Sequence, residues 1–291
     1  MSVSVVIPAF NEAEVIGTVI GDIRAVLGAE AEIIVVDDGS TDGTADMARS
    51  AGARVVRHPD NIGNGAAVKA GIRASRGERV VLMDGDGQHA ASEIPRLLGQ
   101  LEQYDMVVAA RVAGSNGRLH RNVANRIYNG LASYVSGRPI PDLTSGFRAV
   151  RGPVLRRFVY LLPNTFSYPS TLTLALLRSG HRVTFLPIAA RRRVGRSKIR
   201  LIEDGARFFL IILKIATLFS PLRVFLPVSA LFLFAGLGNY AYTFARFGRF
   251  TNMSALMIAN SVLVFLLSLV AEQIAQMRME RTEPVERERD A

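Results

Sequence analysis

The 291-residue sequence contains no cysteine and no tryptophan. The lack of cysteine excludes a disulfide-stabilised fold, a thiolate zinc site and a cysteine nucleophile, and it favours a cytosolic or cytosol-facing protein. Neither a GxGxxG turn after the first apolar strand nor a GxxxxGK[ST] loop occurs, which argues against a dinucleotide-dependent oxidoreductase and a P-loop NTPase. The N-terminal residues lack a charged segment followed by a long apolar one, so we expect no cleaved or exported signal.

Hydrophobic residues make up 49% of the chain, too many for disorder, and they concentrate in its last third. Two runs of 22 residues carry no charge, Val224 to Ala245 and Phe250 to Ala271. As helices, each would reach about 33 Å, enough to cross a hydrocarbon core of about 30 Å. Because four residues separate the runs, we predict a transmembrane hairpin over 222–277. Two buried helices of a soluble core are the less favoured alternative.

Basic residues near the ends of the two runs predict the orientation of this hairpin. Two flank the connecting turn, Arg246 and Arg249, and seven lie on the other side: Arg207, Lys214, Arg223, Arg278, Arg281, Arg287 and Arg289. We therefore expect an integral membrane protein with two spans, whose N-terminal domain, charged tail over 278–291 and both termini are cytoplasmic.

The segment before the hairpin, 199–221, spaces its charges along one helical face and predicts an amphipathic helix in the membrane interface. Just upstream lies the basic cluster RRRVGRSK, Arg191 to Lys198. The cluster either attracts anionic lipid in general or binds a phosphorylated lipid. The net charge of +10 does not indicate nucleic-acid binding, because the basic residues gather beside the membrane segments without aromatic stacking partners.

The first part of the chain, 1–198, is predicted to be an α/β domain. Short β-branched runs begin at Ser2, Glu32, Ala53, Arg79 and Asp105, and helical stretches separate them. This alternation indicates a mostly parallel sheet covered on both faces. In such a sheet ligands bind at the carboxyl ends of the strands. Four polar loops follow those ends, PAFNE, DDGSTDGT, NIGNG and DGDGQ, so we expect them to converge on one edge.

The DGDGQ loop places Asp84, Asp86 and Gln88 at alternate positions. Two carboxylates and an amide oxygen are hard ligands suited to Mg²⁺ or Mn²⁺, which would also bridge the oxygens of a diphosphate. An Asp/Gly turn without a metal is the structural alternative. In the second loop, one of Asp37 and Asp38 is expected to cap the following helix, and the other to accept hydrogen bonds from a base or ribose.

Together, VVIPAFNEAEVI, VVDDGSTDGT, NIGNGAAVKAGI, VLMDGDGQH and DLTSGFRAV resemble the family-2 glycosyltransferases with a GT-A fold. More narrowly, the chain resembles the polyprenyl-phosphate glycosyltransferases, which are dolichol-phosphate mannose synthase-like enzymes, and the likeness extends to RRRVGRSK and the two spans. This resemblance implies a GT-A domain, an interface helix and a two-helix hairpin. Two positions depart from the family pattern, Asn64 where a lysine is frequent and Phe10 where tyrosine occurs.

The resemblance also implies roles for individual residues. Nucleotide binding falls to Pro8, Phe10, Glu12 and Asp38, and metal binding to Asp84, Asp86 and Gln88. Donor and acceptor phosphates would meet Arg111, Arg121, Asn125, Arg193, Ser197 and Lys198. Asp142 resembles the acidic residue near the acceptor, where it orients a group or acts as a base; its alternative is a loop aspartate that caps the turn at Thr144 and Ser145.

The implied reaction is transfer of one sugar, with inversion, from a UDP- or GDP-sugar to undecaprenyl or dolichyl phosphate. The partners are therefore a nucleotide diphosphate sugar, a polyprenyl phosphate and the membrane, and a homo-oligomer is possible. A processive polysaccharide synthase is disfavoured because its Q-x-x-R-W motif needs tryptophan. Transfer to a lipid hydroxyl stays open as a second reaction, and a non-catalytic membrane scaffold stays open as a different class of protein.

Overall fold

The computed structural model describes residues 2–111, 119–164, 168–188 and 217–280. The chain divides into two compact units. The first contains residues 1–133 and 138–204, and the second contains residues 134–137 and 205–291. Most of the predicted interface helix at 199–221 and of the charged tail at 278–291 lies outside the described residues, so these two segments stay predictions.

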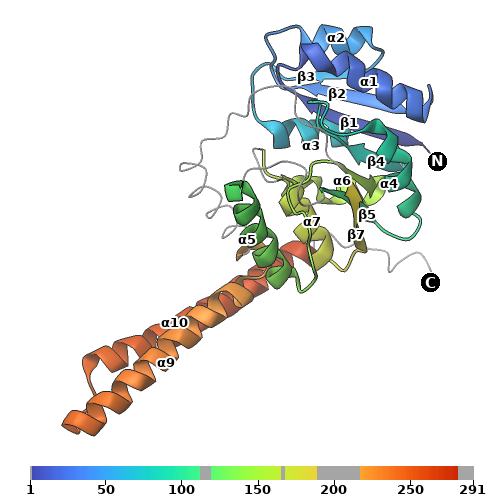
Figure 1. Cartoon of the computed structure of the whole chain (residues 1–291). Coiled ribbons are helices and arrows are strands. Elements are labelled where there is room, and N and C mark those ends of the chain that lie inside the picture. The colour runs from blue at the N-terminus through green and yellow to red at the C-terminus, as the bar shows by residue number, and fades with distance from the viewer. Residues whose placement is uncertain (1, 112–118, 165–167, 189–216, 281–291) are drawn as a thin grey trace. The chain divides into compact units, whose positions relative to one another are not determined.

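The first unit is built around a seven-stranded sheet in the order β3-β2-β1-β4-β6-β5-β7 (Figure 1). The strands are β1 Val3–Ala9, β2 Glu32–Asp37, β3 Arg54–Arg57, β4 Arg79–Leu82, β5 Met106–Arg111, β6 Arg148–Arg151 and β7 Val183–Ile188. The helices are α1 Ala13–Leu27, α2 Thr44–Ser50, α3 Asn64–Ala74, α4 Ile94–Gln100, α5 Leu119–Ser136, α6 Gly152–Phe158 and α7 Tyr168–Arg178, with short 3₁₀ turns at Ala91–Glu93 and Val159–Leu161. The last turn of α5, from residue 134 onwards, belongs to the second unit. The predicted mostly parallel α/β sheet is confirmed.

Helices cover both faces of this sheet because its strands are apolar on both sides. Val5 and Ile7 of β1 point into a core cluster with Ile16 and Ile20 of α1, and α4 joins the same cluster. Val6 points the other way, against Gly71 of α3. Strands buried on both faces are expected in a parallel sheet with crossover helices. Their carboxyl ends are thereby left to the loops.

Strand β6 departs from the parallel pattern. It runs antiparallel to both of its neighbours, and Leu82 of β4 and Val108 of β5 both lie opposite Arg148. The start of β6 therefore lies beside the carboxyl ends of β4 and β5. As a consequence, the segment that precedes β6 reaches the same edge as the DGDGQ loop.

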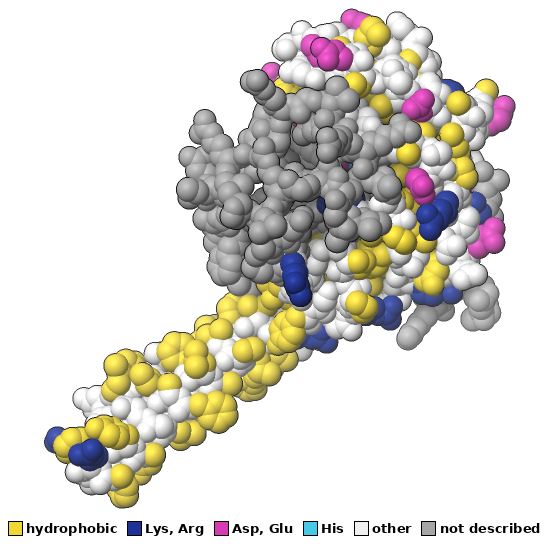
Figure 2. Space-filling model, in the orientation of Figure 1, with side chains coloured by type: hydrophobic (Ala, Val, Ile, Leu, Met, Phe, Trp, Pro, Cys, Tyr) yellow, Lys and Arg dark blue, Asp and Glu magenta, His cyan; other side chains and the backbone are white. Residues whose placement is uncertain are grey.

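The second unit contains two long helices, α9 Pro221–Phe247 and α10 Asn252–Glu280, which lie side by side as a hairpin (Figure 1). Both are long and apolar enough to cross a membrane, with mean hydropathies of 1.7 and 2.2. Only 17% of the apolar 18-residue stretch of each helix is buried, whereas the core helices of a soluble domain are mostly buried. The visible face of the hairpin is largely hydrophobic (Figure 2). The predicted pair of helices is confirmed.

Small residues form the seam between α9 and α10. Apart from Pro221 at the start of α9, the buried positions of the described helices recur every seven residues: Ser229, Gly236 and Thr243 on α9, and Ser254, Ser261, Ser268 and Ala275 on α10. Small side chains let helix backbones approach closely. Close packing matters in lipid because burial of apolar surface gives no hydrophobic driving force for helix association there. The Ser229 hydroxyl also donates to the Ser261 carbonyl oxygen at 2.9 Å, which satisfies a polar group away from water.

Replacing Gly236 by leucine is expected to push the hairpin helices apart. A Cβ atom at Gly236 would already lie 2.9 Å from Ile258 Cγ1 and 3.1 Å from the Ile258 backbone nitrogen. Overpacking of this kind costs about 1–3 kcal/mol. The measurement is disulfide formation in a Ser229→Cys/Ser261→Cys pair, which the cysteine-free chain makes unambiguous. We expect slower crosslinking in the Gly236→Leu background.

Gly238→Leu provides the matched control. It lies on the same helix two residues further on, but no atom lies within 4 Å of its added Cβ. Crosslinking in this background is expected to match the parent. Equal crosslinking in the Gly236→Leu and parent backgrounds would contradict the packing described for the seam.

Candidate active site

The loops after β1 and β2 are held together by hydrogen bonds between them. The Asn11 backbone N–H donates to Ser40 Oγ at 2.9 Å, and the Thr41 N–H donates to Asn11 Oδ1 at 3.0 Å. Asn11 has a φ of 56°, a left-handed conformation that asparagine tolerates better than most residues. The Glu12 N–H donates to Thr44 Oγ1 at 2.9 Å. The two loops therefore form one rigid platform at the sheet edge.

The predicted nucleotide-binding residues on this platform differ in exposure. Phe10 is 38% exposed, whereas Pro8 is buried within β1. Glu12 is half-buried and precedes α1. Phe10 is therefore the member of this group whose side chain is most available for a planar ligand. The roles of all three in nucleotide binding stay predictions.

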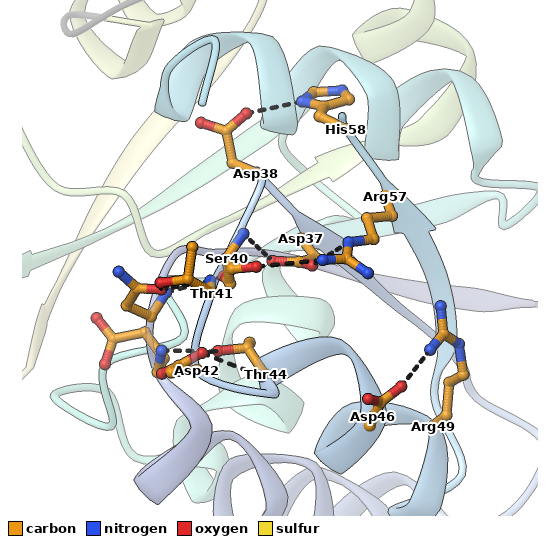
Figure 3. Close-up of polar contacts among 12 residues, drawn as sticks. Asp37, Asp38, Ser40, Thr41, Asp42, Thr44, Asp46, Arg49, Arg57 and His58 are labelled. Atoms are coloured by element: carbon orange, nitrogen blue, oxygen red, sulfur yellow. Dashed lines mark hydrogen bonds and ion pairs between the residues drawn. The ribbon is translucent and has the colours of Figure 1, made fainter. Parts of the chain in front are cut away.

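The two aspartates at the end of β2 hold the surrounding loops (Figure 3). Asp37 accepts the Ser40 N–H at 3.0 Å and pairs with Arg57 at 3.2 Å. Asp38 is 2% exposed and contacts His58 Nδ1 at 2.7 Å. Its carboxylate also accepts the backbone N–H groups of Ile62 and Gly63 at 3.2 Å and 2.8 Å. Both carboxylates have partners within the protein, and the expected contact of one of them with a base or ribose stays a prediction. Asp38 orders the NIGNG loop.

The start of α2 is held by a different aspartate from the two considered in the sequence. Asp42 Oδ1 accepts the Thr44 N–H at 3.1 Å, and its Oδ2 accepts the Ala13 N–H at 3.1 Å (Figure 3). Burial alone would raise the pKa of Asp42, but a hydrogen bond from the Thr44 hydroxyl, together with these two backbone hydrogen bonds, outweighs it and lowers that pKa. Asp42 thus anchors α2 to the start of α1.

The DGDGQ loop follows β4 and turns back at Gly87, whose φ is +72°. Asp84, Asp86 and Gln88 are all half-buried, so their side chains reach the surface of the site. The Gln88 N–H donates to Asp86 Oδ1 at 3.1 Å, which fixes the turn. One oxygen of Asp84, Oδ2, lies 3.7 Å from Nε2 of the buried His89. The loop holds two carboxylates at the carboxyl end of a buried strand, as predicted.

The donor set fits a hard divalent cation, although the described residues contain no cluster of three His, Asp or Glu side chains poised around one point. Two carboxylates and an amide oxygen supply three oxygen ligands, and Mg²⁺ or Mn²⁺ fills its remaining positions with water and phosphate oxygens. Gly146 offers a second observation. A Cβ there would lie 2.6 Å from Asp84 Oδ2, so only glycine leaves the carboxylate its space.

Arg111 and Asp142 form a bidentate ion pair across the same edge. Arg111 Nε lies 2.8 Å from Asp142 Oδ2, and Arg111 Nη2 lies 3.1 Å from Oδ1. Arg111 Nη2 also donates to Thr144 Oγ1 at 2.6 Å, and the Thr144 N–H donates to Asp142 Oδ1. Asp142 therefore caps the turn at Thr144, which was the structural alternative for this residue. Arg111 is not on a freely solvated basic face.

The pair shifts the pKa values of both partners. Burial alone would raise the pKa of Asp142, but hydrogen bonds from Arg111, its positive charge and two backbone N–H groups outweigh burial and lower that pKa. For Arg111, the hydrogen bond to Asp142 raises the pKa. A carboxylate held ionised by several such contacts is a poor proton acceptor. The geometry favours Asp142 as the residue that orients Arg111.

The Arg111–Asp142 pair is expected to make the protein less stable in acid. Because the native pKa of Asp142 lies below its ordinary value of 3.8, its contribution is full above that value. The contribution is lost as the pH falls through the lowered native pKa. Thermal midpoints of the full chain in detergent, from pH 6 to pH 3, should show the wild type converging on Asp142→Asn. A constant gap between the two over this range would contradict the assignment.

Five of the predicted phosphate-binding residues are not described at the level of side chains. Arg121 and Asn125 lie on α5, one helical turn apart, but their side chains are outside the described set. The positions of Arg193, Ser197 and Lys198 lie outside the described residues altogether. Their roles stay predictions.

Four residues at this edge were not singled out in the sequence. His89, Gly146, Arg148 and Tyr168 lie behind or beside Asp84. His89 and Arg148 stand inside motifs that were recognised, DGDGQH and DLTSGFRAV. Burial was the missing signal, because histidine and arginine in a loop ordinarily indicate solvent exposure.

Comparison with known proteins follows the same division of the chain. The family model for glycosyl transferase family 2 matches residues 4–158, and the model for the GtrB C-terminal hairpin matches residues 220–277. Glycosyltransferase AglJ of Haloferax volcanii is 32% identical over 83% of this chain and 80% of its own. A dolichyl-phosphate hexose transferase of the same organism is 33% identical over 70% and 89% of the two chains.

Two further similarities concern a bacterial relative and a solved structure. The undecaprenyl-phosphate mannosyltransferase of Micrococcus luteus is 29% identical, over 68% of this chain and 88% of its own. The crystal structure of glucosyl-3-phosphoglycerate synthase from Mycobacterium tuberculosis, in complex with Mn²⁺, UDP and phosphoglyceric acid, superposes with a TM-score of 0.60. The two chains are 25% identical, and the match covers 74% of this chain and 78% of the other.

Proposed function

The chain belongs to glycosyl transferase family 2, and we propose that it transfers one sugar from a nucleotide diphosphate sugar to a polyprenyl phosphate at the membrane surface. One observation carries the proposal. The same chain joins a glycosyltransferase domain with two half-buried carboxylates at its sheet edge to a hairpin of two membrane-length apolar helices. Relatives that share most of their length with this chain are named for transfer to dolichyl and undecaprenyl phosphate.

The donor diphosphate would be bound at the edge that carries Asp84, Asp86 and Gln88. A divalent Mg²⁺ or Mn²⁺ held by these residues would neutralise the departing nucleotide diphosphate. The structural relative that contains Mn²⁺ and UDP supports this assignment. Arg111, kept in place by Asp142, presents a fixed positive charge to phosphate oxygens at the same edge. UDP and GDP are both compatible with these groups.

The acceptor would attack the sugar directly. A phosphate monoester with a second pKa near 6 is mostly dianionic at neutral pH, so it needs little help from a base. This agrees with Asp142 being held ionised by Arg111 rather than left to accept a proton. A single displacement inverts the configuration at the anomeric carbon. The loop residues and the metal-binding residues would therefore orient the phosphates and stabilise the charge on the departing diphosphate.

The hairpin supplies the membrane attachment that such an acceptor requires. The phosphate of the acceptor lies at headgroup depth, while the polyprenyl tail of the acceptor stays in lipid. We place the glycosyltransferase domain and both termini in the cytoplasm, since Arg246 and Arg249 alone flank the connecting turn. The interface helix over 199–221 would meet the acceptor headgroup, together with Arg193, Ser197 and Lys198 of the basic cluster.

An acceptor comparison tests the reaction class. Purified protein with labelled donor is offered undecaprenyl phosphate, undecaprenol and diacylglycerol in matched detergent. We expect product from the phosphate only, with an inverted anomeric configuration by NMR. Product from undecaprenol or diacylglycerol would replace this proposal by transfer to a lipid hydroxyl. Failure to bind any nucleotide would favour a non-catalytic scaffold.

A further inference from the structure

Arg148 is a fully buried cation without an ion-pair partner among the described residues. It is 0% exposed at the start of β6. Its Nη1 donates to the Pro169 carbonyl at 2.9 Å and to Thr173 Oγ1 at 3.1 Å. Its Nε has no hydrogen-bond partner in the part of the chain that the structure describes. An arginine buried in this way is costly, so its position calls for an explanation beyond packing.

Another contact of Arg148 leads towards Asp84. Its Nη2 donates to the carbonyl oxygen of Ser145. The next residue is Gly146, whose backbone forms the wall behind the Asp84 carboxylate. A Cβ atom there would lie 2.6 Å from Asp84 Oδ2 and 3.0 Å from Oδ1. The guanidinium of Arg148 is thus one residue away from that wall.

The carbonyl oxygens of this segment each have a donor. Arg148 donates to the carbonyl oxygen of Ser145, and the Tyr168 hydroxyl donates to that of Gly146 at 3.4 Å. The Ala109 N–H donates to the carbonyl oxygen of Phe147 at 3.0 Å. Burial raises the pKa of Tyr168, so its hydroxyl stays a donor. Of the three, Arg148 alone supplies a charge-assisted bond, which is about twice as strong as a neutral one.

The charge of Arg148 is also complementary to the site. Burial lowers its pKa, and Tyr168, Asp142 and Asp84 oppose that shift. The two carboxylates among these three groups belong to the site itself. Arg151, three residues along the same strand, differs in this respect. It donates to the carbonyl oxygen of Leu101 and has its own carboxylate, Asp105, at 3.5 Å.

We propose that Arg148 is a positioning residue for the Asp84 carboxylate and acts on it through the Ser145–Gly146 backbone. In this role it would act without direct contact with substrate or metal. Its planar fork holds the Ser145 carbonyl and α7 at once, and this fixes the distance between the Gly146 backbone and Asp84. The inference rests on the proposed metal role of Asp84, and it adds a residue from outside the loop.

Arg148→Lys tests the geometry, because lysine keeps the positive charge but loses the planar fork. The readout is Mn²⁺ binding to the purified full chain in detergent, followed by the EPR signal of free Mn²⁺ without donor or acceptor. We expect about a tenfold weaker Mn²⁺ affinity, at the lower end of what loss of an outer-shell partner costs. Arg151→Lys is the matched control, and its Mn²⁺ affinity should equal that of the wild type.

Tyr168→Phe keeps the proposal testable if Arg148→Lys does not fold. It preserves the ring and removes only the donor to the Gly146 carbonyl, so it should weaken Mn²⁺ binding by a smaller factor. The proposal is overturned if Arg148→Lys folds and binds Mn²⁺ as the wild type does. It is also overturned if Arg151→Lys weakens binding equally, if Tyr168→Phe binds normally while Arg148→Lys is unfolded, or if the wild type binds no Mn²⁺.

These readouts do not depend on the acceptor. Weaker Mn²⁺ binding in Arg148→Lys, together with no transfer to undecaprenyl phosphate by the wild type, would leave the positioning role standing and overturn only the proposed reaction. Normal transfer with unchanged Mn²⁺ binding in every variant would do the reverse.

Discussion

Asp84→Asn is expected to lower kcat by about a thousandfold while membrane insertion and fold are retained. The amide keeps the size of the side chain but removes the charge that binds the metal. Charge stabilisation by a bound metal is worth several kcal/mol, and about 4 kcal/mol corresponds to a thousandfold. Asp84 is half-buried with its carboxylate against Gly146. Because asparagine has the same size, the substitution leaves no cavity there. The measurement is label transfer to lipid at saturating donor and Mn²⁺.

Asp46→Asn is the matched control for this experiment. Asp46 lies on the surface of α2, where its side chain is 82% exposed and pairs with Arg49. Exposed pairs of this kind contribute little, so activity should equal that of the wild type. Full activity of Asp84→Asn would refute the metal role of the DGDGQ loop.

Gly146→Ala is expected to lower kcat by about a hundredfold through a single added methyl group. Its Cβ would lie 2.6 Å from Asp84 Oδ2, closer than carbon and oxygen atoms can approach. The carboxylate must therefore move away, and a displacement of about 1 Å in a catalytic group can cost a hundredfold. The measurement is kcat together with Mn²⁺ affinity, and both should fall.

Gly99→Ala provides the comparison, because no atom lies within 4 Å of its added Cβ in α4. Alanine there should leave kcat unchanged and raise the thermal midpoint slightly, since alanine favours helix over glycine by about 1 kcal/mol. Wild-type kcat in Gly146→Ala would show that the wall behind Asp84 has no bearing on catalysis.

Much of the fold can be predicted from the sequence because the first 110 residues alternate cleanly. The runs at Glu32–Asp37 and Asn64–Ala74 match a strand and a helix nearly residue for residue. Strand β6 could not be predicted in this way. It has four residues with arginine at both ends, a pattern typical of a loop, and its antiparallel pairing depends on contacts far away in sequence.

In the candidate site too, some residues could be predicted from local sequence and others could not. Asp84 and Asp86 are recognisable because they follow a buried strand at a set spacing. The Arg111–Asp142 pair is not recognisable, because its partners lie 31 positions apart in the sequence. The contact of Asp38 with a nucleotide stays a prediction, whereas the hydrogen bonds that its carboxylate accepts from the backbone of the NIGNG loop were not foreseen. Local patterns predict which residues reach the sheet edge, whereas tertiary contacts decide which of them already have partners.

The hairpin shows a similar limit. Length and lack of charge predict its two helices. Ser229, Gly236 and Thr243 recur every seven residues inside an apolar run. A hydropathy pattern does not distinguish them, because the rest of the run is apolar on every face of the helix. Their role becomes visible only when α10 brings its own small residues opposite them.

The most direct test of the proposed reaction is formation of a lipid-linked monosaccharide by the purified full chain. Undecaprenyl or dolichyl phosphate is incubated with a panel of labelled UDP- and GDP-sugars, with Mg²⁺ or Mn²⁺ and with or without EDTA. We expect labelled lipid from one donor, only when the metal is present, and none from Asp84→Asn. Labelled lipid that forms equally in EDTA, or no labelled lipid from any donor despite intact nucleotide binding, would contradict the proposed metal-dependent transfer.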